Sequence, residues 1–171
     1  GALYACVPLP EERGAVDVVT VHLQAGDEPR AREVRAQQLA HVRDLIARSG
    51  DDDRPFVITG DFNIQGLAEH KGAEYTQLRS LLDGFEDLGA ERDLPTFEPE
   101  VNPFARAFHP DGVPLRIDYV FFRPAKARPS RLRFERATRF FERPLRRDGA
   151  AGEQLYASDH YGLTAVFSLG D

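Results

Sequence analysis

The chain has 171 residues, which is most simply one domain, and a domain of this size buries roughly 70% of the surface that its unfolded form exposes. Its composition, 42% hydrophobic and 29% charged, is typical of a globular protein and excludes a largely disordered chain. Cys6 is the only cysteine, which excludes an intrachain disulfide and a zinc site built from cysteines. We expect neither a membrane span nor a signal peptide, and we interpret the absence of methionine as the mark of a processed product or fragment.

The net charge of −6 is unevenly distributed along the chain. The segment Arg123–Arg147 holds ten lysines and arginines but only two glutamates. This pattern favours contact with an anionic surface, either lipid or nucleic acid, although a solvated strand face would show the same charges. The rings of Phe134, Phe140 and Phe141 in this segment either touch such a surface or pack in the core. No sequence feature indicates an oligomer.

The N-terminal half alternates strand and helix patterns. Two β-rich runs, 3–7 and 16–23, are separated by prolines and a glycine and predict a hairpin. The second run alternates between one face with Val19, Val21 and Leu23 and another with Val18, Thr20, His22 and Gln24. Apolar spacing predicts a helix over 28–48, with Arg35 on its apolar stripe, and a buried strand over 56–59.

The C-terminal half continues this alternation. The patterns predict a helix over 73–82, a long irregular region over 95–114, and strands over 117–122, 132–134 and 163–169. Alternating strands and helices indicate an α/β layered sandwich, in which ligands bind beside the loops that leave strand ends. The polar residues considered next lie at the ends of strand-like runs, so we expect them to converge on one face.

The sequence Gly-Asp-Phe-Asn places the carboxylate of Asp61 and the amide of Asn63 two residues apart. On an extended backbone this spacing puts both side chains on the same side. Hydrolysis of a phosphate ester needs a carboxylate to orient water or hold a hard cation, and a neutral donor for a phosphate oxygen. A Gly-Asp turn, with Asn in a permissive conformation, is the competing interpretation.

Two further stretches carry acid and histidine side chains. Ser158-Asp159-His160 precedes the last strand, where the carboxylate can ligate a divalent cation and the imidazole can titrate near neutrality; a turn with an exposed histidine is the alternative. Asp118 lies inside an apolar strand, where it needs a partner, either a histidine that it orients or an arginine such as Arg116.

His22 is the remaining titratable candidate, on the same strand face as Gln24. Its imidazole can donate a proton to a leaving oxygen or contact a phosphate. A hydrogen-bonded core histidine is the alternative interpretation.

Taken in order, His-Leu-Gln, the helix with Arg35 and Gln38, Gly-Asp-Phe-Asn, Arg-Ile-Asp-Tyr-Val and Ser-Asp-His-Tyr resemble the endonuclease/exonuclease/phosphatase superfamily. This superfamily includes pancreatic-type deoxyribonucleases, apurinic endonucleases, inositol polyphosphate 5-phosphatases and neutral sphingomyelinases. The resemblance covers nearly the whole chain, and Val-His-Leu-Gln-Ala-Gly is most similar to the sphingomyelinase branch.

The resemblance implies a two-sheet α/β sandwich of the deoxyribonuclease type and a metal-dependent phosphodiester hydrolase. It implies that Asp61 and Asn63 orient the attacking water and contact the phosphate, and that His160 is a general base or phosphate contact whose imidazole Asp118 holds. His22 would stabilise or protonate the leaving side. Whether Asp61 or His160 takes the proton stays open. The resemblance further assigns substrate contacts to Gln24, Arg35, Gln38 and Asn63, and contact with Mg²⁺ or Mn²⁺ to Asp159 and Asp61.

Family members carry an earlier segment with an Asn and a Glu that hold the metal, and this chain begins after the place where they belong. We therefore expect residues 1–171 to be the C-terminal part of the family domain, with an open sheet edge where the first strands of the fold would pair. For the isolated chain we expect weak metal affinity and little activity.

The resemblance leaves three hypotheses for function. The first is a hydrolase of a phospholipid headgroup or a similar small phosphate ester. The second is a Mg²⁺-dependent nuclease, which the basic segment favours and the overall acidity disfavours. The third is a non-catalytic remnant that keeps the fold without the metal-binding Glu.

Overall fold

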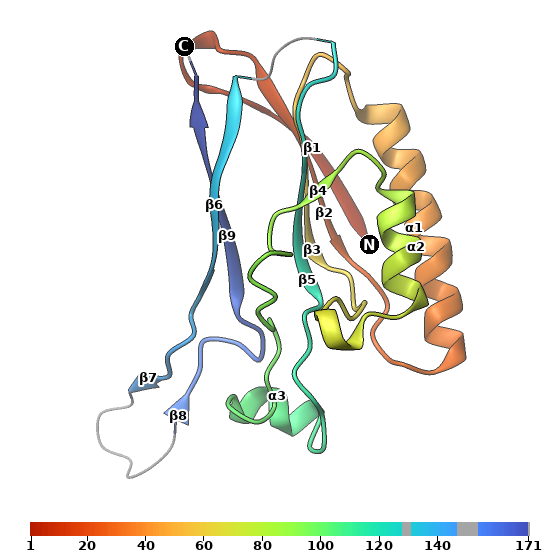
Figure 1. The fold of residues 1–171 in the computed structure, drawn as a ribbon, viewed down its shortest axis with the longest axis vertical. Coiled ribbons are helices and arrows are strands. Elements are labelled where there is room, and N and C mark those ends of the chain that lie inside the picture. Colours follow the sequence, from red (N-terminus) through yellow and green to blue (C-terminus); the bar gives the residue numbers. More distant parts are fainter. Residues whose placement is uncertain (128–130, 147–153, 171) are drawn as a thin grey trace.

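The computed structural model describes residues 1–127, 131–146 and 154–170. Five strands form the central sheet in the order β1-β2-β3-β5-β4 (Figure 1). The β1–β2 hairpin is antiparallel as expected, β3 is parallel to β2, and β5 is antiparallel to β3. The strands of this sheet are β1 (Ala2–Pro8), β2 (Ala15–His22), β3 (Phe56–Asp61), β4 (Glu86–Asp87) and β5 (Asp118–Arg123).

Two helices, α1 (Pro29–Ser49) and α2 (Ala73–Leu81), cover one face of the central sheet (Figure 1). Proline at the first position of α1 has the backbone angle that a helix start needs, and the helix buries one stripe of side chains. The core between helices and sheet includes Val19, Val21 and Leu23, which form one of the two faces separated in the sequence, together with Leu39, Val42, Leu78, Ile58 and Phe121.

A second sheet packs against the other face of the central sheet (Figure 1). It pairs β6 (Leu132–Phe140) with β9 (Gly162–Leu169) in antiparallel orientation. A separate antiparallel pair is formed by β7 (Leu145–Arg146) and β8 (Gln154–Leu155). The two-sheet α/β sandwich is therefore confirmed. Within the described residues, β6 and β9 each have one edge without a strand partner.

The region 95–114 is less irregular than its prolines suggest. It contains α3 (Pro103–Phe108), whose first turn is capped by the side chain of Asn102, which accepts a hydrogen bond from the amide of Phe104 at 3.0 Å. Two short 3₁₀ turns, Pro10–Glu12 and Ala68–His70, complete the helical elements of the described chain. None of the helices described is long and apolar enough to cross a bilayer.

Candidate active site

A row of titratable side chains lies along one edge of three neighbouring strands. In the β2–β3 register His22 is the partner of Asp61, and in the β3–β5 register Asp61 is the partner of Asp118. The row arises because β3 is parallel to β2 and antiparallel to β5, so the last residue of β3 meets the last residue of β2 and the first of β5. The structure thus brings together three residues that are up to 96 positions apart in sequence.

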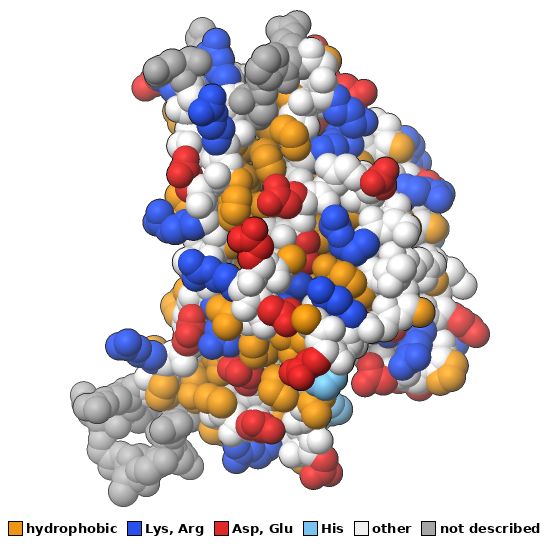
Figure 2. All heavy atoms as spheres, in the orientation of Figure 1, with side chains coloured by type: hydrophobic (Ala, Val, Ile, Leu, Met, Phe, Trp, Pro, Cys, Tyr) orange, Lys and Arg blue, Asp and Glu red, His pale blue; other side chains and the backbone are white. Residues whose placement is uncertain are grey.

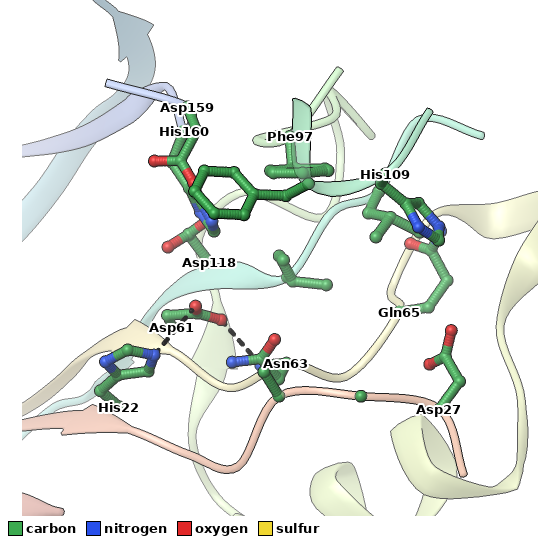
Figure 3. Close-up of a pocket in the computed structure, with 15 residues that line it drawn as sticks. His22, Asp27, Asp61, Asn63, Gln65, Phe97, His109, Asp118, Asp159 and His160 are labelled. Atoms are coloured by element: carbon green, nitrogen blue, oxygen red, sulfur yellow. Dashed lines mark hydrogen bonds and ion pairs between the residues drawn. The ribbon is translucent and has the colours of Figure 1, made fainter. Parts of the chain in front are cut away.

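His160 reaches this row from the loop before β9. Its backbone bridges to Phe97, and the ring Nδ1 lies 2.8 Å from Oδ2 of Asp118 (Figure 3). Arg116, the competing partner for Asp118, donates instead to the buried carboxylate of Asp87. The Asp118–His160 pair that the family resemblance implies is therefore present. Since Asp118 engages Nδ1, the other ring nitrogen of His160 is left for a second partner.

The carboxylate of Asp61 has titratable neighbours on two sides, His22 on one and the Asp118–His160 pair on the other. Nε2 of His22 lies 3.6 Å from one oxygen of Asp61 (Figure 3), and ligand atoms of Asp61, Asp118 and His160 all lie within 4.8 Å of one another. Burial and the charge of Asp118 raise the pKa of Asp61, although the amide of Asn63 and the two histidines oppose that shift. Burial lowers the pKa of His160, but the hydrogen bond and charge of Asp118 outweigh it, and the pKa of His160 is raised.

The Gly-Asp-Phe-Asn stretch is both a turn and part of this site. Gly60 has a φ of 132°, and a Cβ there would lie 1.9 Å from the carbonyl oxygen of Val21. The amide of Asn63 donates to Oδ1 of Asp61 at 2.8 Å, and Asn63 takes the left-handed conformation at φ 52°. The side-chain amide of Asn63 donates to the carbonyl of Leu23 at 3.1 Å, which ties the end of β3 to the loop after β2.

All five of the predicted catalytic residues line one pocket of about 630 Å³. Asp159 lines the same pocket, with its Oδ1 3.0 Å from the Ser158 hydroxyl that donates to it, but it is not part of the Asp61–Asp118–His160 cluster. Figure 3 shows these side chains on one side of the pocket and Asp27, Gln65 and His109 on the other. His22 has 75% of its side chain exposed, which excludes the core-histidine interpretation.

The site fits a hard cation in part. Asp61 and Asp118 are neighbouring carboxylates, and burial together with the charge of Asp118 raises the pKa of Asp61; carboxylates are the donor type that Mg²⁺ and Mn²⁺ prefer. One oxygen of each nearby carboxylate is already engaged: His160 contacts Asp118, the amide of Asn63 donates to Asp61, and the Ser158 hydroxyl donates to Asp159. Each carboxylate therefore has a second oxygen that could face a cation. A Mg²⁺ ion takes six oxygen ligands, so most of its ligands would be waters, substrate oxygens or groups outside this cluster.

Gln24, Arg35 and Gln38 do not line the pocket. Arg35 is buried, donates to both oxygens of Glu74 at 3.0 and 2.9 Å, and donates from Nη1 to the carbonyls of Gln24 and Gly26 at 2.8 and 2.6 Å. Oε1 of Gln38 accepts from the amide of Gln24 at 2.8 Å. These contacts hold the loop after β2, whose residues 25–27 form part of the pocket wall.

Sequence reasoning missed two buried residues whose side chains form hydrogen bonds with the backbone beside the site residues. Oγ1 of Thr96 accepts from the amides of Ile117 and Asp118 at 3.2 and 3.1 Å. Nδ2 of Asn102 donates to the carbonyl of Ser158 at 2.8 Å and to that of Asp159 at 3.3 Å. The dipeptide Asn102-Pro103 is a helix-start signal that would have identified the cap, whereas nothing local in the sequence indicates the role of Thr96.

The basic segment Arg123–Arg147 is only partly a free surface. Arg139 pairs with Glu98 at 3.1 Å and Lys126 with Asp52 at 3.1 Å. Phe134 packs against the core between the sheets, while 59% of Phe141 is exposed. Residues 128–130 and 147 lie outside the described part of the chain, and contact with an anionic surface stays a prediction.

Comparison with known proteins finds related sequences and structures. A phospholipase C of Staphylococcus aureus is 28% identical over 160 residues, which cover 88% of this chain and 46% of that protein. The chain therefore spans about half the length of the curated relatives it matches.

Solved structures share the fold at lower identity. Sphingomyelinase C from Streptomyces griseocarneus matches 98% of this chain with 56% of its own, at 21% identity and a TM-score of 0.66. TDP2 of D. rerio, complexed with a single-strand DNA product, matches 98% with 67% of its own, at 20% identity and a TM-score of 0.71. A beta toxin of Staphylococcus aureus with bound magnesium ions matches 100% with 58% of its own, at 20% identity and a TM-score of 0.63. The endonuclease/exonuclease/phosphatase family model matches residues 2–160, so this chain belongs to that family.

Proposed function

We propose that this chain forms part of a divalent-metal-dependent phosphodiester hydrolase that acts on a phospholipid headgroup. The observation that carries the proposal is the Asp118–His160 pair beside Asp61, in one pocket with His22 and Asn63. Membership of a family of phosphoesterases and nucleases supports the reaction class. The phospholipase C relative supports a lipid substrate.

Different residues of the chain accept and donate the protons that are transferred during hydrolysis. In this reaction a water oxygen bonds to phosphorus, the ester P–O bond breaks, and the proton lost by the water is balanced by one gained at the departing alcohol oxygen. Asp61 and His160 flank the reacting phosphate and are the two candidates for the base. His22, exposed beside Asp61, is the donor to the leaving oxygen, and Asn63 contacts the phosphate or steers the water.

A bound Mg²⁺ or Mn²⁺ ion would supply positive charge for the phosphate oxygens in the transition state. Asp61 and Asp159 would hold it in this chain, together with ligands from outside these residues. The beta toxin with bound magnesium supports a metal in this fold. Asp118 contributes by fixing the orientation of the His160 ring and not as a metal ligand.

A nuclease is the second candidate. The TDP2 structure with DNA and the basic segment favour it, since neutralising phosphates requires lysine and arginine. The net charge of −6 and the internal pairing of Arg139 and Lys126 count against a polyanionic substrate. A non-catalytic remnant is the third, and the intact Asp118–His160 pair argues against it.

The test measures Mg²⁺-dependent hydrolysis of sphingomyelin and phosphatidylcholine vesicles in parallel with plasmid DNA. In a protein that carries residues 1–171 together with the further metal ligands, we expect lipid hydrolysis that His160→Ala abolishes and that His41→Ala, a change on the exposed face of α1, leaves intact. Cleavage of DNA alone would replace the lipid proposal by the nuclease. Lipid hydrolysis that survives His160→Ala would show that the site is wrongly assigned, and silence on all substrates favours the remnant.

A further inference from the structure

The helix at the mouth of the pocket carries its apolar side chains outward. Ala105 of α3 is fully buried against Phe97 and Ile117, so this side of the helix faces the protein. Phe104 and Phe108 are four residues apart and therefore share another side of the helix. Phe108 is 76% exposed, the highest value among the large apolar residues described, and Phe104 is 38% exposed.

Two valines that flank the helix in sequence are exposed as well. Val101 is 49% exposed and Val113 is 50% exposed. We call Val101, Phe104, Phe108 and Val113 the apolar rim. Large apolar side chains that gather in one segment, instead of lying singly over the surface, mark an interaction site.

The rim is held in place by the protein beneath it. Asn102 caps α3 and is fully buried, and its side chain also donates to the carbonyls of Ser158 and Asp159. Arg106 ties the helix to the preceding loop by donating to the carbonyl oxygens of Pro99 and Glu100 at 2.9 and 2.5 Å. The rim is thus joined by hydrogen bonds to the loop that carries His160.

The rim is also continuous with the candidate active site. Phe108 and His109 line the same pocket as Asp61 and His160, and Phe97, Leu115 and Ile117 give that pocket an apolar wall. Figure 1 places α3 at one end of the molecule, below the ends of the central strands. A molecule with a phosphodiester next to apolar chains would have both parts matched, the phosphate by the titratable row and the chains by the rim.

We infer that the apolar rim docks on the surface of a zwitterionic phospholipid bilayer and brings the pocket to the lipid phosphates. Apolar side chains on a structured element bind at the boundary of headgroups and acyl chains through the area they bury. A net charge of −6 disfavours a strongly anionic surface, which leaves apolar burial as the main attraction. The role of this docking, which is to deliver lipid to the pocket, rests on the proposed function. Binding to vesicles can nevertheless be measured in the absence of hydrolysis.

The first experiment is co-sedimentation of the chain with phosphatidylcholine vesicles in Mg²⁺-free buffer. We expect binding, a loss of partitioning of about tenfold for Phe108→Ser, and a smaller loss for Val113→Ser, because each change removes apolar area that the bilayer would bury. Val7→Ser is the matched control, since Val7 is 42% exposed on β1 and lies at the strand end away from the titratable row. Circular dichroism and melting of each variant check that it is folded.

The second experiment uses the absence of tryptophan from the chain. In Phe108→Trp the new indole is the only tryptophan, and we expect its emission to shift to the blue when phosphatidylcholine vesicles are added. In Val7→Trp we expect no shift. A blue shift at position 108 needs neither metal nor catalysis, so it stands even if no substrate is hydrolysed.

Three results would overturn the inference. In the first, the chain fails to sediment with phosphatidylcholine vesicles. In the second, the rim variants bind as well as the parent chain, which would assign binding to other exposed apolar residues such as Phe141 and Leu145, exposed at 59% and 51%. In the third, the parent chain self-associates without binding vesicles and Phe108→Ser makes it monomeric, which assigns the rim to a protein contact.

Discussion

Replacement of Arg35 tests whether this residue positions the pocket wall or contacts the substrate. Arg35 is 1% exposed, and its guanidinium holds Glu74 and two carbonyls of the loop after β2. Arg35→Met keeps much of the aliphatic stem but removes all of these donors. We therefore expect a large loss of stability, and loss of the loop geometry that shapes one wall of the pocket.

The magnitude follows from the burial of the two partners. Removing one member of a buried ion pair costs roughly 3–5 kcal/mol, because the other member is left unpaired. Glu74 is 28% exposed and water can reach it, so we expect the lower end, about 3 kcal/mol. With a slope of roughly 2 kcal/mol/M, the urea midpoint should fall by about 1.5 M.

The assay is urea unfolding followed by circular dichroism, with Arg32→Met as the matched control. Arg32 approaches the same glutamate at 3.6 Å but is 57% exposed, so its removal should cost less than about 0.5 kcal/mol. If Arg35→Met unfolds at the same urea concentration as Arg32→Met, the positioning role is wrong. An unchanged midpoint together with lost substrate affinity would instead restore Arg35 as a substrate contact.

Two further predictions concern titration of the site. Asp118→Asn should lower the pKa of His160, measured by NMR titration of its ring protons, because burial remains while the raising hydrogen bond and charge are lost; an unchanged pKa would contradict the pairing. Asp61→Asn should raise the melting temperature of the metal-free chain at neutral pH. Because the pKa of Asp61 is raised in the folded state, the folded protein favours the protonated carboxyl group. The stability that this carboxyl contributes is present below its unfolded-state pKa and is lost as the pH rises through its folded-state pKa, whereas Asn carries no charge at any pH. In a domain of this size each kcal/mol of added stability raises the melting temperature by roughly 2–4 °C, and the gain should vanish in acid. A variant that melts at or below the parent temperature at neutral pH would refute the argument from burial and repulsion.

Most of the secondary structure was predictable because it depends on local patterns. The helix expected over 28–48 is observed as Pro29–Ser49, since proline, apolar spacing and Ser-Gly all act within a few residues. β6 was predicted over only three residues and extends to Phe140, because a register shift between Phe134 and Arg136 interrupts the alternation of apolar and charged residues. α3 was missed because a six-residue helix among prolines has too few turns to show a period, although Asn102-Pro103 signals its start.

The candidate site shows the same division between local and distant causes. The sequence by itself determined which side chains are candidates for the site, because Gly-Asp-Phe-Asn and Ser-Asp-His are local arrangements with recognisable residue types. It left open whether Asp118 pairs with Arg116 or a histidine, and whether His22 is buried. Strand register decided the first point by placing Asp118 next to Asp61 and within reach of His160.

Tertiary structure alone also decided what the remaining polar residues do. Arg35 sits on the apolar stripe of a helix, and nothing in its neighbours along the chain shows that its charge is used by Glu74 and the carbonyls of a distant loop. The outward placement of Phe108 likewise depends on Ala105 filling the inner side of α3. Local sequence specifies the chemistry of each side chain, but its partner is set by which strands and loops pack together, and that is a property of the whole fold.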